Sequence, residues 1–234
     1  RTMTKPEFIN LFPLTLYKAR IELSDSQKKE MINEILQMKN SSKSENQTKG
    51  TAWAGYTNGN QDLFDNSKFD FFFNEVSIHI KNYVTQFQIN LDEVDCYFHR
   101  AWATISDGKE SIKPHFHAQS HLTFAFYLNK SPDDANIQFT DGTRHNEFIP
   151  SLFASRSVGK KSLFKERNIN NVGTVDINCL EGDIIIFPSK TLHSTQPNSI
   201  NKQRISISAD IGFVSKNNES LEFLVPPLNK WKKF

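Results

Sequence analysis

The chain has 234 residues, 37% of them hydrophobic and 12% aromatic, which is enough for one sizeable core. A formal charge of +2, scattered Lys and Arg, and no long apolar run give no indication of a nucleic-acid partner or a membrane span. Only two cysteines occur, Cys96 and Cys179, and the N-terminus lacks a secretory pattern, so we expect a protein of the reducing cytosol.

The N-terminal part of the chain is predicted to begin with a strand over residues 14–23. The segment 24–40 follows it with a Ser-Asp start signal, and Met31 and Ile35 lie at the spacing of one helix face. This pattern predicts an amphipathic helix packed against the rest of the protein.

A polar stretch separates this helix from a second one. Residues 41–66 are rich in Ser, Asn, Thr and Gly but include Trp53, so we interpret them as an ordered surface loop with aromatic anchors. Residues 67–87 repeat apolar side chains every three or four positions, which predicts a helix. His79 in this helix is interpreted as an ordinary helix-surface histidine.

The pattern changes near residue 94 to short apolar or alternating runs separated by Gly, Asp, Asn and Pro. Such runs are typical of a β-sandwich or barrel. We therefore predict a mainly β fold in which residues 1–93 form a helical support and residues 94–234 form the catalytic core, together one structural domain. The polar insertion 154–171 is interpreted as a lid or a solvated loop.

Three of the seven histidines gather in the segment 114–129, "PHFHAQSHLTFAFYLN". Counted by twos along a strand, His115, His117 and His121 share a polar face, while Phe124 and its alternate neighbours face the core. A bend near residues 118–120 would break this phase, so the two ends of the count carry more weight than its middle. The face would be merely solvated in an ordinary strand. However, two imidazoles at positions i and i+2 point the same way and can approach one metal ion.

A third ligand is expected from the segment 181–197, "EGDIIIFPSKTLHSTQP". A Gly-Asp turn leads into an apolar strand that ends at Pro188, and His193 follows five residues later. After the earlier pair of histidines, this order is typical of a metal-binding double-stranded β-helix, in which the ion lies between two sheets.

The segment 203–213, "QRISISADIGF", alternates almost perfectly between polar and apolar side chains. Arg204, Ser206, Ser208 and Asp210 share the polar face. An edge strand would leave the arginine in solvent. We favour a pocket position, because an arginine one strand beyond the last ligand can bind a carboxylate with its planar guanidinium.

Taken together, these motifs resemble those of the 2-oxoglutarate and Fe(II)-dependent oxygenases, in particular a small family of bacteria and phages. The similarity spans most of the chain and fades over 154–171. The matching residues are His115, His117, Ser120, Leu122, Tyr127, Gly182, Phe187, Pro188, Ser189, His193 and the run Arg204–Ser208.

This resemblance implies a jelly-roll core and a hydroxylase of the bacterial or phage-host cytosol, with Fe(II), 2-oxoglutarate, O2 and possible use of ascorbate. It implies three iron ligands: His115, His117 and His193. Arg204 would bind the C5 carboxylate of 2-oxoglutarate, Ser206 would donate a hydrogen bond to it, and Tyr127 would add a phenol contact. The products would be succinate, CO2 and an oxidised substrate.

One residue departs from the wider superfamily, which normally supplies two histidines and one carboxylate. His117 replaces that carboxylate, which leaves the site one charge more positive. His121 is either a fourth ligand or, as we favour, a group behind the ligands or facing the substrate.

Two alternatives stay open at this level. A cupin would use four ligands and need no arginine; these ligands would be His115, His117, His121 and His193. A jelly-roll binding module would bind without turnover. The sequence does not identify the substrate, a small molecule or a peptide, nor the oligomeric state.

Overall fold

The computed structural model describes residues 6–43, 48–153, 164–197, 200, 202–217 and 223–234. Within these ranges the fold is mainly β, as predicted, with few helices. The α-helices are α1 (Asp25–Asn40) and α2 (Asp70–Gln86). The strands are β1 (Tyr17–Arg20), β2 (Trp53–Ala54), β3 (Val94–Ser106), β4 (Ile112–His115), β5 (Leu122–Asn129), β6 (Ile137–Thr140), β7 (Thr174–Ile177), β8 (Asp183–Pro188), β9 (His193–Thr195) and β10 (Arg204–Ser215).

The strands form two antiparallel sheets. The larger has six strands in the order β1-β8-β5-β10-β3-β2, and the smaller has four in the order β4-β9-β6-β7. Strand β10 lies inside the large sheet and pairs with β3 on one side and β5 on the other. The two strands that precede residue 94, β1 and β2, are the edge strands of this sheet.

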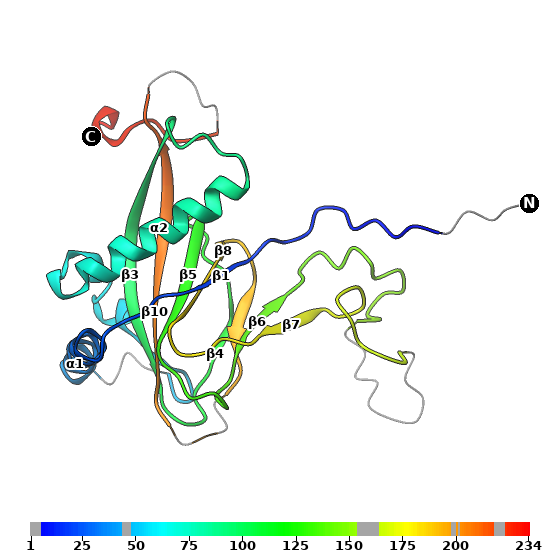
Figure 1. The fold of residues 1–234 in the computed structure, drawn as a ribbon, viewed down its shortest axis with the longest axis horizontal. Coiled ribbons are helices and arrows are strands. Elements are labelled where there is room, and N and C mark those ends of the chain that lie inside the picture. The colour runs from blue at the N-terminus through cyan, green and yellow to red at the C-terminus, as the bar shows by residue number, and fades with distance from the viewer. Residues whose placement is uncertain (1–5, 44–47, 154–163, 198–199, 201, 218–222) are drawn as a thin grey trace, which may run out of the picture.

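Both predicted helices are present, and the start signal of α1 works as the sequence indicates. The Ser24 side chain caps α1, and Gln27 completes a capping box by bonding back to the Ser24 backbone. Helix α2 buries aromatic side chains such as Phe72, which contacts Phe126 of β5 at 4.7 Å between ring centroids. In Figure 1, α2 crosses in front of the large sheet, so this face of the sheet is covered by helix.

The large sheet separates two apolar cores. On β8, Ile184 and Ile186 belong to the core that includes the helices, while Ile185 and Phe187 belong to a smaller core with β6 residues such as Phe139. The strand is therefore buried on both faces, which explains its continuous apolar run.

The segment 114–129 is not one continuous strand, and the break in its alternation includes residues 118–120. Strand β4 ends at His115 in the small sheet, and β5 begins at Leu122 in the large sheet. The connection crosses between the sheets because its backbone bonds to other strands: the His121 N–H donates to Ile211, and the His121 carbonyl accepts from Ser189. The two ends of the alternation therefore lie in different sheets.

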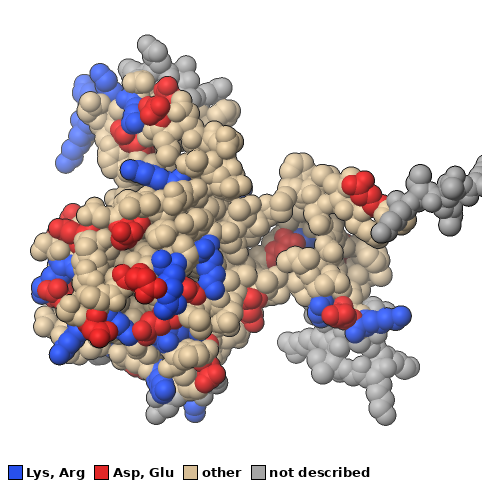
Figure 2. Space-filling view, viewed as in Figure 1, with Lys and Arg blue, Asp and Glu red and all other residues tan. Residues whose placement is uncertain are grey.

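The polar insertion falls partly outside the described residues, at 154–163, and its remaining part, 164–171, contains no helix or strand. On the face shown in Figure 2, basic and acidic side chains are interspersed, in keeping with the net charge of +2. Among the described helices, none combines the length and the apolar character needed to cross a membrane.

Candidate metal centre and its cavity

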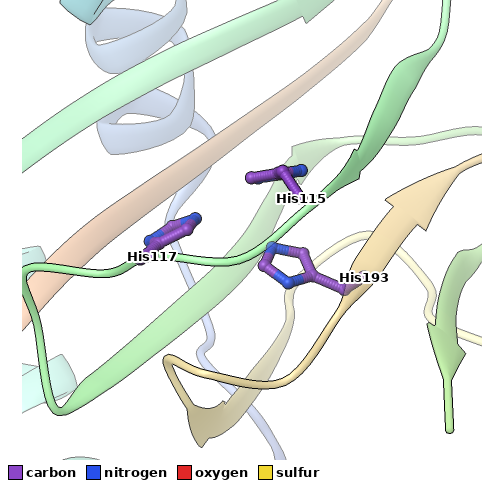
Figure 3. Close-up of side chains that lie close together, drawn as sticks. All are labelled: His115, His117 and His193. Atoms are coloured by element: carbon purple, nitrogen blue, oxygen red, sulfur yellow. The ribbon is translucent and has the colours of Figure 1, made fainter. Parts of the chain in front are cut away.

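Three histidines converge where the small sheet meets the β4–β5 connection (Figure 3). His115 at the end of β4 lies directly opposite His193 at the start of β9. His117 follows two residues later, and its backbone N–H donates to the Ser189 carbonyl at 2.9 Å. One potential ligand atom from each histidine lies within 4.8 Å of the other two.

The three imidazoles are oriented by the same kind of contact, in which Nδ1 lies against an oxygen atom. The contacts are His115 to the Lys113 carbonyl at 2.9 Å, His117 to Asp210 Oδ1 at 2.6 Å, and His193 to the Thr191 carbonyl at 2.8 Å. Carbonyl and ionised carboxylate oxygens only accept, so each Nδ1 must carry the proton. Each Nε2 is then left with a lone pair for a metal ion.

Burial keeps two of these ligands in the neutral form that a metal requires. Burial and the adjacent His115 lower the pKa of His193 to about 3. Burial likewise lowers the pKa of His115 below its ordinary value. At neutral pH both rings are therefore uncharged, and they need not lose a proton before binding a cation.

This donor set fits an Fe(II) ion. Imidazole nitrogen is a common ligand for iron and other transition metals. Ligand nitrogens about 2.1 Å from a shared ion lie about 3 to 4 Å apart, and the three ligand atoms here lie within 4.8 Å of one another. Among the described residues, these three histidines are the set of His, Cys, Asp or Glu side chains that lie close enough together to hold one metal ion.

A buried carboxylate supports His117 from behind. Asp210 on β10 has no exposed surface, and its Oδ2 accepts hydrogen bonds from Arg100 Nε and Nη2 at 2.8 and 2.5 Å. Ser120 Oγ and Gln119 Nε2 complete its contacts at 3.2 and 3.3 Å. Burial acts to raise the pKa of Asp210, but the hydrogen bonds from His117 and Arg100 outweigh it and hold that pKa below its ordinary value.

The predicted cosubstrate residues line the same cavity as the histidines, which has a volume of about 390 Å³. Arg204 is 2% exposed, and its Nη1 donates to Asp134 Oδ1 at 2.9 Å and to the Ala135 carbonyl at 3.0 Å. Its Nη2 lies 3.3 Å from Thr195 Oγ1. Ser206 of β10 lies opposite Tyr127 of β5 in the register of the large sheet.

A second buried cation lies near Arg204. Lys130 is buried, with Nζ 3.0 Å from the Asp134 carbonyl and 5.9 Å from the centre of the Tyr127 ring. Burial lowers the pKa of Lys130, and burial raises that of Tyr127, whose phenol therefore stays protonated. Of these two cations, Arg204 lines the cavity and Lys130 does not.

His121 lies apart from the other histidines. Its Nδ1 accepts a hydrogen bond from the Phe213 N–H at 3.0 Å, and its ring stacks on that of Phe213. The side chain is exposed and is not among the residues that line the cavity. It stabilises the contact between the β4–β5 connection and β10, so its position favours neither a fourth ligand nor a substrate contact.

The sequence predicted no functional role for three buried charged residues of this region: Asp134, Asp210 and Lys130. The alternation of β10 places Asp210 on the same face as Arg204, which is a usable signal. Asp134 and Lys130 belong to the connection after β5 and carry no periodic pattern, so only the three-dimensional structure relates them to Arg204.

The comparisons with known proteins agree with this geometry. Residues 100–210 match the family model described as "Putative 2OG-Fe(II) oxygenase", where 2OG denotes 2-oxoglutarate. This range includes the three histidines, Arg204 and Asp210. No curated protein matches the sequence.

Several solved structures share the fold at low sequence identity. The epimerase SnoN from nogalamycin biosynthesis is 13% identical, with 89% of this chain and 83% of SnoN covered and a TM-score of 0.55. HygX from Streptomyces hygroscopicus, solved with nickel and 2-oxoglutarate, is 11% identical over 85% and 83% of the two chains, with a TM-score of 0.51.

A prolyl-4-hydroxylase from Pseudomonas putida is 11% identical, with 84% of this chain and 92% of that enzyme covered and a TM-score of 0.50. At these identities the similarity concerns the fold, while the family assignment depends on the matched segment. Residues 100–210 of this chain are thus similar to the 2-oxoglutarate and Fe(II)-dependent oxygenases.

Proposed function

We propose that this oxygenase is a hydroxylase in which His115, His117 and His193 hold Fe(II) and Arg204 binds 2-oxoglutarate. One observation carries the proposal. Three imidazoles, each with its Nε2 left free by an Nδ1 hydrogen bond, line the same cavity as a buried arginine. This combination also disfavours a cupin, because His121 lies outside the cavity and the cupin pattern does not require Arg204.

When bound, Fe(II) supplies activation of O2 coupled to decarboxylation of 2-oxoglutarate to succinate and CO2, with ascorbate as a possible reductant. The residues of the chain bind and orient the reactants. The Lys113 and Thr191 carbonyls fix the rings of His115 and His193, which leaves the Nε2 lone pair of each ring available before any ion enters.

The cosubstrate end is arranged for a carboxylate. Asp134 and the Ala135 carbonyl hold the Nη1 edge of Arg204, which reduces the conformational freedom that the side chain must lose on binding. Ser206 lies on the same strand face and is proposed to donate a hydrogen bond to that carboxylate, with the Tyr127 phenol as a further contact.

We further propose that the two sheets form a double-stranded β-helix. Consecutive strands from β3 onward change sheets repeatedly: β3, β5, β8 and β10 belong to the large sheet, and β4, β6, β7 and β9 to the small one. Such alternation brings the ends of β4 and β9 together with the face of β10, and it is expected of a jelly roll.

A small prime substrate, or one side chain of a peptide, fits this site best. The cavity volume of about 390 Å³ is near the lower end of the range for small-molecule sites, about 300 to 1,000 Å³, and 2-oxoglutarate must share it. We place the enzyme in the cytosol, which the two free cysteines support.

The test separates metal binding from cosubstrate binding in the absence of O2. His193→Ala should lose Mn(II) binding, because the ligand set falls to two imidazoles. Arg204→Ala should keep Mn(II) binding but weaken 2-oxoglutarate by at least about 30-fold, since truncating one partner of a buried charge pair costs about 2 to 5 kcal/mol. Isothermal titration calorimetry measures both affinities.

Lys113→Ala is the matched control, because Lys113 is an exposed cation that lines the same cavity. It should leave both affinities unchanged. Arg204→Lys, which keeps the charge opposite Asp134 but loses the planar guanidinium, should fall between wild type and Arg204→Ala. Unchanged 2-oxoglutarate affinity in a folded Arg204→Ala variant would show that the arginine is not the cosubstrate ligand.

A further inference from the structure

The three proposed ligands are all neutral imidazoles, yet a carboxylate lies directly behind one of them. We propose that Asp210 is a positioning residue that supplies the metal centre with its negative charge through His117. This inference rests on the proposed iron site. It assigns to Asp210 of β10 the negative charge that the three ligands lack.

The contact between Asp210 and His117 is short and fully buried. The Oδ1 atom lies 2.6 Å from His117 Nδ1, which is typical of a charge-assisted hydrogen bond, and neither side chain has more than 7% exposed surface. A carboxylate in this position draws the Nδ1 proton towards itself. The Nε2 lone pair then becomes more basic and binds a divalent cation more tightly.

Asp210 differs in this respect from the other two Nδ1 partners. His115 and His193 are held by backbone carbonyls, which orient a ring but carry no net charge. His117, by contrast, is held by an ionised side chain, and it occupies the position where the wider superfamily has a carboxylate. The negative charge is thus retained but lies one hydrogen bond away from the ion.

Arg100 balances this charge when no metal is present. It is the direct cross-strand partner of Asp210 and binds Oδ2, whereas His117 binds Oδ1. The guanidinium is partly exposed and lies 5.2 Å from the Trp102 ring centre. The metal-free protein therefore avoids an unpaired buried carboxylate, which would be costly.

The alternative is an ordinary cross-strand ion pair that only stabilises β3 against β10. Removing either partner would then lower stability, and neither change would alter metal affinity. If Asp210 supplies charge to the centre, removing Asp210 should instead weaken metal binding, whereas removing Arg100 should not.

The experiment measures Co(II) affinity by absorption titration, without 2-oxoglutarate and without turnover. Asp210→Asn should weaken Co(II) binding about 10- to 100-fold, the usual effect of losing a partner behind a metal-bound histidine. Arg100→Gln should leave the affinity unchanged or raise it, because Asp210 then keeps its full charge. Asp183→Asn, which alters a buried carboxylate of β8 that pairs with Lys18 and Arg20, should leave it unchanged.

The double variant Arg100→Gln with Asp210→Asn covers the case in which Asp210→Asn alone fails to fold. It removes both charges and leaves a neutral pair, and it should bind Co(II) as weakly as the single Asp210→Asn variant. Wild-type affinity in either folded Asp210 variant would overturn the inference while leaving the three-histidine site intact. Failure of the wild type to bind Co(II) would instead overturn the proposed iron site.

Discussion

Acidification should destabilise the metal-free protein through His193. Burial and His115 lower its folded-state pKa to about 3, whereas the ordinary value is 6.5. The stability that His193 contributes is therefore fully present above pH 6.5 and is lost as the pH falls from there towards 3, because the unfolded chain takes up the proton first. From pH 7 to pH 5 this linkage amounts to about 2 kcal/mol.

Urea unfolding of the metal-free protein with a chelator at pH 7 and pH 5 measures this loss. His193→Asn is the matched variant, because its amide can still donate to the Thr191 carbonyl but does not titrate. The wild type should lose about 2 kcal/mol more than the variant over this range. Equal losses would refute the account, since they would mean that His193 takes up its proton as readily in the folded protein as in the unfolded chain.

Three further predictions concern the fold. Ser24→Ala should lower the free energy of unfolding by about 1 kcal/mol, because it removes the cap of α1, and Ser24→Thr should retain most of it in the same urea assay. Phe72→Ala should cost about 3 to 5 kcal/mol, whereas Phe87→Ala, at a half-exposed ring, should cost far less; similar losses would contradict the assigned core. In native protein a thiol reagent should modify Cys96 and not Cys179, whose burial raises its pKa to about 11; rapid labelling of both would contradict this burial.

Local sequence patterns predicted the helix and the strand in which side chains of one kind recur at a fixed interval. The spacing of Met31 and Ile35 predicted α1, and a nearly perfect alternation predicted β10 with Arg204 and Asp210 on one face. These patterns suffice because a helix or strand repeats its exposure at a fixed interval. The family resemblance, confirmed over residues 100–210, then added the chemistry.

The crossing between sheets could not be predicted in the same way. Counting by twos treated His115 and Tyr127 as members of one strand, but they lie in different sheets. Whether a chain continues or crosses depends on backbone hydrogen bonds to distant strands, such as that between His117 and Ser189. For the same reason, the sequence did not indicate that Asp210 lies against His117.

The shared orientation of the imidazoles has a calorimetric consequence. His115 and His193 already hold their single proton on Nδ1, and their lowered pKa values keep Nε2 bare at neutral pH. Metal entry therefore displaces no proton from either ring. The heat of metal binding at these two ligands should therefore not change between buffers of different ionisation enthalpy. At mildly acidic pH, protons should compete only weakly with the metal for these two nitrogens.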